Sequence, residues 1–162
     1  MIRTLENLQV AVATSLALAC LVAGAILPSP ARGQTLTDLR GGVYTDEGGF
    51  AMGGGVIRPL KSGTSWYFNP NVEAAFADRS DQVSMNADIH YDFPTAPTYS
   101  VYAGAGPALI ISHPDRGDTQ TDAGINLVGG VDWRQESLRP FVQMKGVLSD
   151  QGELAIMGGI RF

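Results

Sequence analysis

The chain has 162 residues, a length typical of one domain, and its 16 acidic and 11 basic side chains give a formal net charge of −5. Because no basic patch or stripe interrupts this acidic balance, the sequence argues against nucleic acid as a partner. The single cysteine, Cys20, excludes an internal disulfide and a zinc site built from several cysteines.

The first residues of the chain differ in kind from the rest. A short head containing Arg3 precedes an apolar run over 10–27, and small residues follow at Ser29 and Ala31. This order is typical of a secretory signal peptide, which we expect to be cleaved after Ala31. The alternative is an uncleaved anchor helix, because the apolar run has nearly the length that spans a membrane. More apolar residues follow Cys20, which argues against acylation of a lipoprotein there.

The expected signal peptide over 1–31 leaves a mature domain over 32–162, in which apolar and polar residues alternate with period two. Turns rich in Gly, Pro, Asp and Ser interrupt the alternation. The pattern predicts eight β-strands, over 37–45, 49–59, 65–77, 82–93, 98–112, 121–134, 138–149 and 152–162. Because proline removes a ladder hydrogen bond, we expect the strand that contains Pro70 to bend or to begin late.

One face of these strands is apolar, and the other carries charges of both signs. The charged positions are Arg40, Glu73, Asp88, Asp132, Arg134, Arg139, Lys145, Glu153 and Arg161. The strands are long enough to supply the ~9–11 residues that a tilted membrane-spanning strand needs. The prediction is therefore an all-β fold, an eight-stranded antiparallel up-and-down transmembrane barrel with lipid outside and ion pairs inside. The alternative is a soluble lipocalin-like barrel, in which the apolar face would surround a ligand.

The aromatic residues indicate the membrane independently. If both termini lie on one side of the barrel, seven aromatic residues share one rim and the outward face: Trp66, Phe68, Tyr91, Phe93, Tyr99, Trp133 and Phe162. Such girdles mark membrane interfaces. The opposite rim is poorer, with Phe50 and Phe76. Because a bilayer tolerates no open sheet edge, the last strand must pair with the first and place Phe162 at the lipid-facing rim.

These features resemble the small eight-stranded outer-membrane β-barrels of Gram-negative bacteria, the OmpA/OmpX-like barrels. The resemblance covers nearly all of the mature chain and includes the C-terminal "AIMGGIRF". It implies residence in the outer membrane, periplasmic termini, and recognition of Phe162, with Ile160, Gly158 and Ile156, by the barrel-assembly machinery. It also implies contact with outer-membrane lipid and lipopolysaccharide, a monomer, and a structural, surface-interaction or envelope-adaptation role.

Two groups of polar residues raise the alternative of an enzyme that acts on outer-membrane lipid. Asp88, His90 and Asp92 share one inward face and could hold a metal ion or act as an acid–base group. His90, however, is expected near the periplasmic end, away from outer-leaflet lipid. Ser112 and His113 are expected at the outer rim, but adjacent strand residues point to opposite faces.

The outer connections carry an adhesion-like tripeptide and an acidic surplus. Arg116-Gly117-Asp118 resembles an integrin-binding motif, although its composition is that of an ordinary turn. The acidic residues of these connections are Asp46, Glu47, Asp78, Asp81, Asp115, Asp118 and Asp150, against Arg79 and Arg116. They could share divalent cations with anionic lipid, but no calcium-loop spacing is present. Because side chains can fill an eight-stranded barrel, we expect no wide pore, no catalytic, cofactor-binding or metal site, and no enzyme activity.

Overall fold

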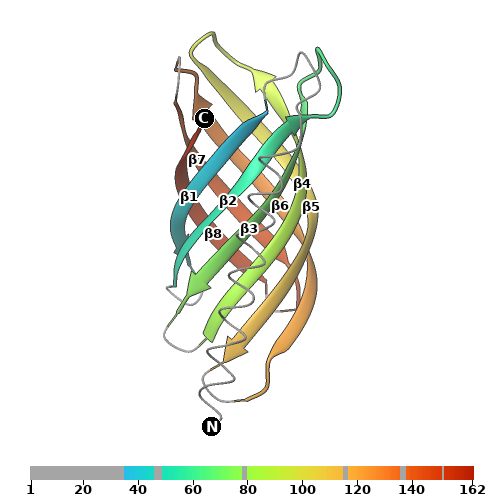
Figure 1. Cartoon of the computed structure of the whole chain (residues 1–162), viewed down its shortest axis with the longest axis vertical. Helices are drawn as coiled ribbons and strands as arrows, with labels where there is room; N and C mark the ends of the chain where they lie inside the picture. Colours follow the sequence, from blue (N-terminus) through green and yellow to red (C-terminus); the bar gives the residue numbers. More distant parts are fainter. Residues whose placement is uncertain (1–34, 46–48, 78–79, 115–116, 136–137, 151) are drawn as a thin grey trace.

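Eight antiparallel strands form a closed barrel, in which each strand pairs with its neighbours in the chain and the last pairs with the first (Figure 1). The computed structural model describes residues 35–45, 49–77, 80–114, 117–135, 138–150 and 152–162. The strands are β1 (Leu36–Tyr44), β2 (Phe50–Pro59), β3 (Trp66–Phe76), β4 (Ser80–Pro94), β5 (Tyr99–Pro114), β6 (Gln120–Trp133), β7 (Arg139–Leu148) and β8 (Glu153–Arg161). The expected signal peptide lies outside the described residues. Within them, no helix is long and apolar enough to cross a membrane.

All eight predicted strands are confirmed. The central strands are longer than those at the closing seam: β4 and β5 have 15 and 16 residues, whereas β1 and β8 have 9 each. The barrel wall is therefore taller around β4 and β5, as Figure 1 shows.

Alternation along each strand decides which side chains face the lumen. In β4, Asp88 is 2% exposed, whereas the next residue, Ile89, is 41% exposed. In β7, Lys145 is buried and its neighbour Met144 is 54% exposed. The apolar face is thus outside and the polar face inside, as in a membrane barrel. This orientation contradicts the lipocalin-like alternative, which requires the reverse.

Of the nine charged positions expected in the lumen, six are buried. They are Arg40, Glu73, Asp88, Asp132, Lys145 and Arg161. The expectation is wrong for Arg134, which is exposed just beyond the end of β6. Arg139 and Glu153 are only half-buried, because each is the first residue of its strand and lies at a rim.

The aromatic girdle, defined as the seven rim residues named above, lies at the end of the barrel that holds the chain's C-terminus. Trp66 pairs with Tyr91 across β3 and β4, and their ring centroids are 5.1 Å apart. Phe162 is 50% exposed, and its backbone exchanges two hydrogen bonds with Thr37, of 2.8 and 2.9 Å. These bonds hold the last residue against β1 and complete the closure.

Pro70 interrupts the hydrogen-bond ladder between β2 and β3 without ending the strand. The paired residues run up to Gly55 and Asn71 and resume at Arg58 and Phe68. Opposite the gap, the Asn69 side chain donates from Nδ2 to the carbonyl oxygen of Val56 at 3.1 Å. This bond replaces the donor that proline lacks. β3 still begins at Trp66, so the expectation of a late start is wrong.

We expect Asn69→Ala to lower the free energy of unfolding by about 1–3 kcal/mol, because it leaves the Val56 carbonyl in the barrel wall without a donor. Pro70→Ala restores a backbone N–H and should recover part of that loss in the Asn69→Ala background. Urea unfolding of the barrel refolded in detergent micelles measures both effects. If the changes in unfolding free energy caused by Asn69→Ala and Pro70→Ala simply added in the double variant, Asn69 would not be compensating for Pro70.

Candidate functional site

A buried set of ion pairs, which we call the Arg40 network, joins β1, β3 and β7 across the lumen. Arg40 donates to Asp38 from Nε at 3.0 Å and from Nη2 at 2.6 Å, and to Glu73 from Nη1 at 3.2 Å. Lys145 forms an ion pair with Glu73, which also accepts a hydrogen bond of 3.3 Å from the Tyr44 hydroxyl. All five side chains are buried, so each charge depends on the others for its stability.

A ladder of side-chain amides holds one further carboxylate, Asp88, beside this network. Asn71 donates to Asp88 Oδ2 at 2.9 Å, and Asn126 donates to Oδ1 at 3.1 Å. Asn86 links the two amides, since it accepts from Asn126 at 2.8 Å and donates to Asn71 at 2.9 Å. Asp88 is therefore anchored from β3 and β6 by neutral groups, and no described residue forms an ion pair with it.

The third of the lumen nearest the C-terminus is built around Arg161. Its Nη1 donates to Asp132 Oδ2 at 2.5 Å, and its guanidinium lies 4.6 Å from the ring centroids of both Tyr102 and Phe141. Tyr102 donates its hydroxyl to Gln143 at 3.0 Å. Arg161 Nε, Asp132 Oδ1 and Gln143 Nε2 are buried without a partner among the described side chains. Because buried polar groups need partners, we expect ordered water in this part of the lumen.

The structure does not bring Asp88, His90 and Asp92 together. His90 Nε2 lies 3.5 Å from Asp92 Oδ1, whereas Asp88 belongs to the amide ladder. The imidazole instead packs against the rings of Tyr67 and Tyr102, with centroids 5.5 and 5.3 Å away. Among the residues that the structure describes, no three His, Cys, Asp or Glu side chains are grouped to hold a metal ion.

Ser112 and His113 lie near the outer end of β5, as expected, and face opposite sides of the wall. Ser112 pairs with Gln82 of β4, and His113 pairs with Asp81. No hydrogen bond joins the serine to the histidine in the described part of the chain, so they do not form a nucleophile–base pair.

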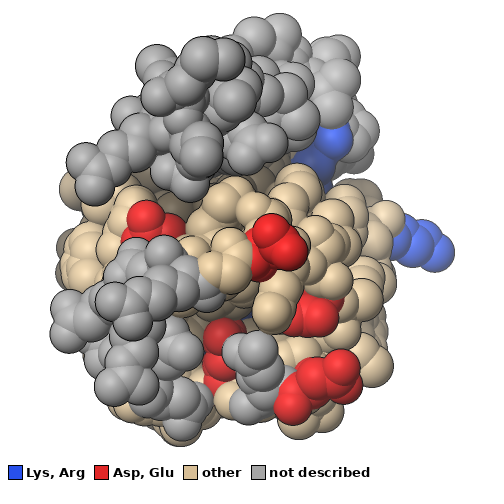
Figure 2. Space-filling view, turned by 90° about the horizontal axis from the view of Figure 1, so that it is seen from below, with Lys and Arg blue, Asp and Glu red and all other residues tan. Residues whose placement is uncertain are grey.

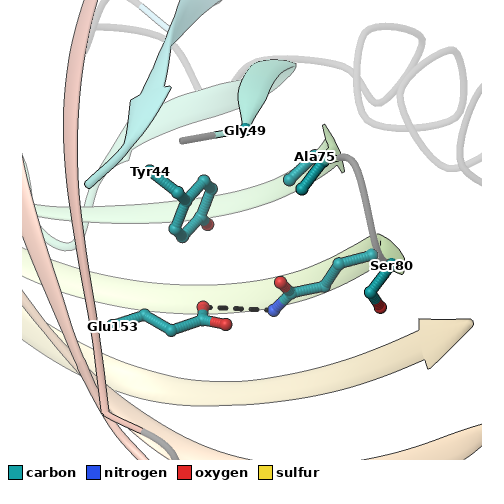
Figure 3. A pocket seen from close by; sticks show the side chains of 7 residues that line it. Tyr44, Gly49, Ala75, Ser80 and Glu153 are labelled. Carbon is teal, nitrogen blue, oxygen red and sulfur yellow. Dashed lines mark hydrogen bonds between the residues drawn. The ribbon is translucent and has the colours of Figure 1, made fainter. Parts of the chain in front are cut away.

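A small pocket lies at the outer end of the lumen (Figure 3). It is lined by Tyr44, Gly49, Ala75, Ala77, Ser80, Gln82 and Glu153. Gln82 donates to Glu153 across it at 3.2 Å. The free space is about 20 Å³, room for about one water molecule. It is therefore too small for a lipid, and Tyr44 connects it directly to the Arg40 network.

Acidic side chains gather on the outer end of the barrel, which Figure 2 shows face-on. The described charged residues of this rim are Asp81, Asp118, Asp122, Asp150 and Glu153. The other residues of the expected acidic surplus, Asp46, Glu47, Asp78 and Asp115, lie outside the described residues, as do Arg79 and Arg116. Asp118 is exposed, but the adhesion-like tripeptide is only partly described.

Sequence reasoning missed two residues that organise the lumen. Asp38 is fully buried and makes the bidentate contact with Arg40, and Tyr102 is buried beneath Arg161. The signal was available, because Asp38 shares the parity of Arg40 along β1 and Tyr102 shares the parity of Ser100 along β5. Alternation could have placed both side chains in the lumen, but it could not have identified their partners.

Comparison with solved structures identifies the architecture. The N-terminal β-barrel domain of Pseudomonas aeruginosa OprF matches with a TM-score of 0.69 and 17% identity, covering 81% of this chain and 97% of that domain. Neisserial surface protein A matches with a TM-score of 0.64 and 16% identity, covering 78% and 94%. This chain has the fold of the eight-stranded outer-membrane β-barrels. The OmpA/OmpX-like architecture expected from the sequence is thus confirmed.

This fold alone does not determine a function. The outer-membrane enzyme PagL also matches, with a TM-score of 0.52 and 11% identity, covering 78% of this chain and 98% of that one. No protein-family model and no curated protein matches the sequence. Proteins with this fold therefore include an enzyme. The function of this chain depends on its own side chains and not on the fold.

Proposed function

We propose that this chain is a non-catalytic integral protein of the bacterial outer membrane with a structural role in the envelope. The observation that carries the proposal is the lumen itself, which the Arg40 network crosses from β1 to β3 and β7 with every charge paired. A lumen closed in this way favours a rigid wall over a channel. Ser112 and His113 at the outer rim are not hydrogen-bonded to each other, which argues against hydrolysis.

The exterior supports the expected partners. Exposed apolar side chains surround the barrel between its rims, a surface that suits the acyl chains of phospholipid and lipopolysaccharide. Phe162 ends this surface in an exposed position, where the barrel-assembly machinery could read it. Every edge of the described strands is paired within one chain, so the barrel closes without a second copy, which supports the expected monomer.

Conductance and permeability test the structural role. In planar bilayers, the purified barrel should give no stable conductance steps, because the Arg40 network blocks the lumen. Cells that lack the protein should admit more of an apolar dye, and the wild-type chain should restore the barrier. Stable open channels in the wild type, or an unchanged barrier in its absence, would contradict the proposal.

Lipid analysis tests the enzymatic alternative. Vesicles made from outer-membrane lipid should show no new lipid product by mass spectrometry after incubation with the refolded barrel. Release of fatty acid that disappears in His113→Ala or His90→Ala would replace the structural proposal with an enzymatic one. The same two variants should otherwise restore the permeability barrier as well as the wild type.

A further inference from the structure

Among the residues that the structure describes, the basic side chains on the surface of the barrel all lie at the end that holds the C-terminus. Of the described lysines and arginines, Arg40, Lys145 and Arg161 are buried in the lumen and paired with carboxylates. The others are Arg58, Lys61, Arg134 and Arg139. They lie at the end of β2, in the following turn, after β6 and at the start of β7, which is the end that carries the aromatic girdle. The described charges of the outer rim are all acidic, so the described surface charges at the two ends of the barrel have opposite signs.

Two of these surface cations, Arg58 and Lys61, have no acidic partner among the described residues, whereas Arg134 and Arg139 both interact electrostatically with Asp92. The side chains of Arg58, Lys61 and Arg139 make no hydrogen bond or ion pair with any described residue, and Arg134 donates only to the hydroxyl of Ser100. Arg139 also lies directly opposite Arg161 in the pairing of β7 with β8. Like charges in this position are unfavourable unless an anion compensates them, and here Asp132 already pairs with Arg161. Arg58 and Lys61 are therefore the cations left without compensation among the described residues.

Arg58 lies at the depth where lipid headgroups are found. It pairs with Phe68, a girdle residue, on the lipid-facing side of β2 and β3. Trp66, two residues away on the same face, packs against Tyr91. Aromatic belts sit at the headgroup level of a membrane, and a guanidinium at this level can bind phosphate oxygens through two parallel N–H donors.

We propose that Arg58, with Lys61, Arg134 and Arg139, binds the phosphate groups of anionic phospholipid in the periplasmic leaflet. The proposal rests on the membrane location proposed above and on the orientation that the resemblance implies, with both termini in the periplasm. Each basic side chain near an anionic surface contributes attraction that falls off within a Debye length, so the effect should be sensitive to salt. The acidic outer rim gives the opposite preference and would repel such lipid. The barrel therefore has a built-in preference for a phospholipid leaflet at its periplasmic end.

Unfolding in two kinds of vesicle tests the proposal. The wild-type barrel is refolded into vesicles of phosphatidylcholine alone, or of phosphatidylcholine mixed with phosphatidylglycerol, and the urea midpoint is read from its heat-modifiable migration. We expect phosphatidylglycerol to raise the midpoint, and raised salt to remove most of the increase. The variant Arg58→Gln/Lys61→Gln/Arg139→Gln should keep the midpoint in phosphatidylcholine and lose the increase. An equal increase in this variant would overturn the proposal.

A matched variant at the other end controls for net charge. Asp81→Asn/Asp118→Asn/Asp150→Asn changes three exposed charges of the outer rim and should retain the increase with phosphatidylglycerol. If the control loses it too, the basic end is not the binding surface. If inorganic phosphate added to phosphatidylcholine vesicles reproduces the increase, the site binds free phosphate and the lipid proposal is wrong. A wild type that fails to insert at all would instead contradict the proposed membrane location.

Discussion

Replacing Gly42 by alanine should prevent the barrel from closing. Gly42 pairs with Met157 at the seam between β1 and β8. A Cβ atom at Gly42 would lie 2.1 Å from the carbonyl oxygen of Ile156 and 2.7 Å from the Cα of Met157. Both are backbone atoms and cannot turn aside as a side chain would. We expect a loss of about 4 kcal/mol or more, or no folded barrel, because the two strands must move apart at the point of closure.

Heat-modifiable migration and urea unfolding of the refolded protein measure this effect. Gly146→Ala is the matched control, because a Cβ at Gly146 meets no atom within 4 Å. The control lies within β7 and should fold with nearly wild-type stability. Folding of Gly42→Ala with a normal midpoint would show that the seam is looser than its backbone contacts indicate.

Removing the Arg40 guanidinium should be the most costly change to the lumen. Arg40→Met leaves Asp38 without a cation and leaves Glu73 with Lys145 alone. Breaking a buried ion pair on one side typically costs about 3–5 kcal/mol, because the remaining charge stays buried without compensation. We therefore expect a large fall in the urea midpoint of the refolded barrel.

The double variant Asp38→Asn/Arg40→Met separates charge from packing. It removes the Asp38 carboxylate, which Arg40→Met alone leaves buried without a cation. The double variant should therefore recover part of the stability lost in Arg40→Met. Lys61→Met removes an exposed cation and should leave the midpoint in detergent micelles nearly unchanged. If Arg40→Met lowered the urea midpoint no more than Lys61→Met, the Arg40 network would not be stabilising the lumen.

Most of the wall of this barrel could be predicted from the sequence. Alternation is a local property of a strand, so it indicated correctly that Lys145 faces the lumen and that Ile160 faces outward. The turns marked the strand ends, and the closing role of Phe162 followed from the need to pair every edge. The prediction that Arg134 faces the lumen was wrong. The alternating sequence pattern continues past Trp133, where β6 ends, but the side chain beyond that point is no longer buried by the barrel.

For the lumen, the sequence predicted which side chains face inward but not which of them contact each other. The sequence showed that opposite charges share the inward face, but the distance between two of them depends on how far the strands are staggered when the sheet closes. Asp88 and His90 illustrate this point: they are two residues apart in β4, yet they contact different networks. A metal site at these residues was therefore conceivable from spacing alone and is not formed by the described side chains.

The sequence by itself determined the number of strands, their two faces and the residue that closes the barrel, because these depend on a period of two and on edges that must be paired. Only the tertiary structure decided that Arg40 reaches Glu73, 33 residues away, and that Asn69 substitutes for the donor missing at Pro70. Both contacts depend on the register and stagger of the closed sheet. That stagger is a property of all eight strands together, and no single segment of the sequence contains it.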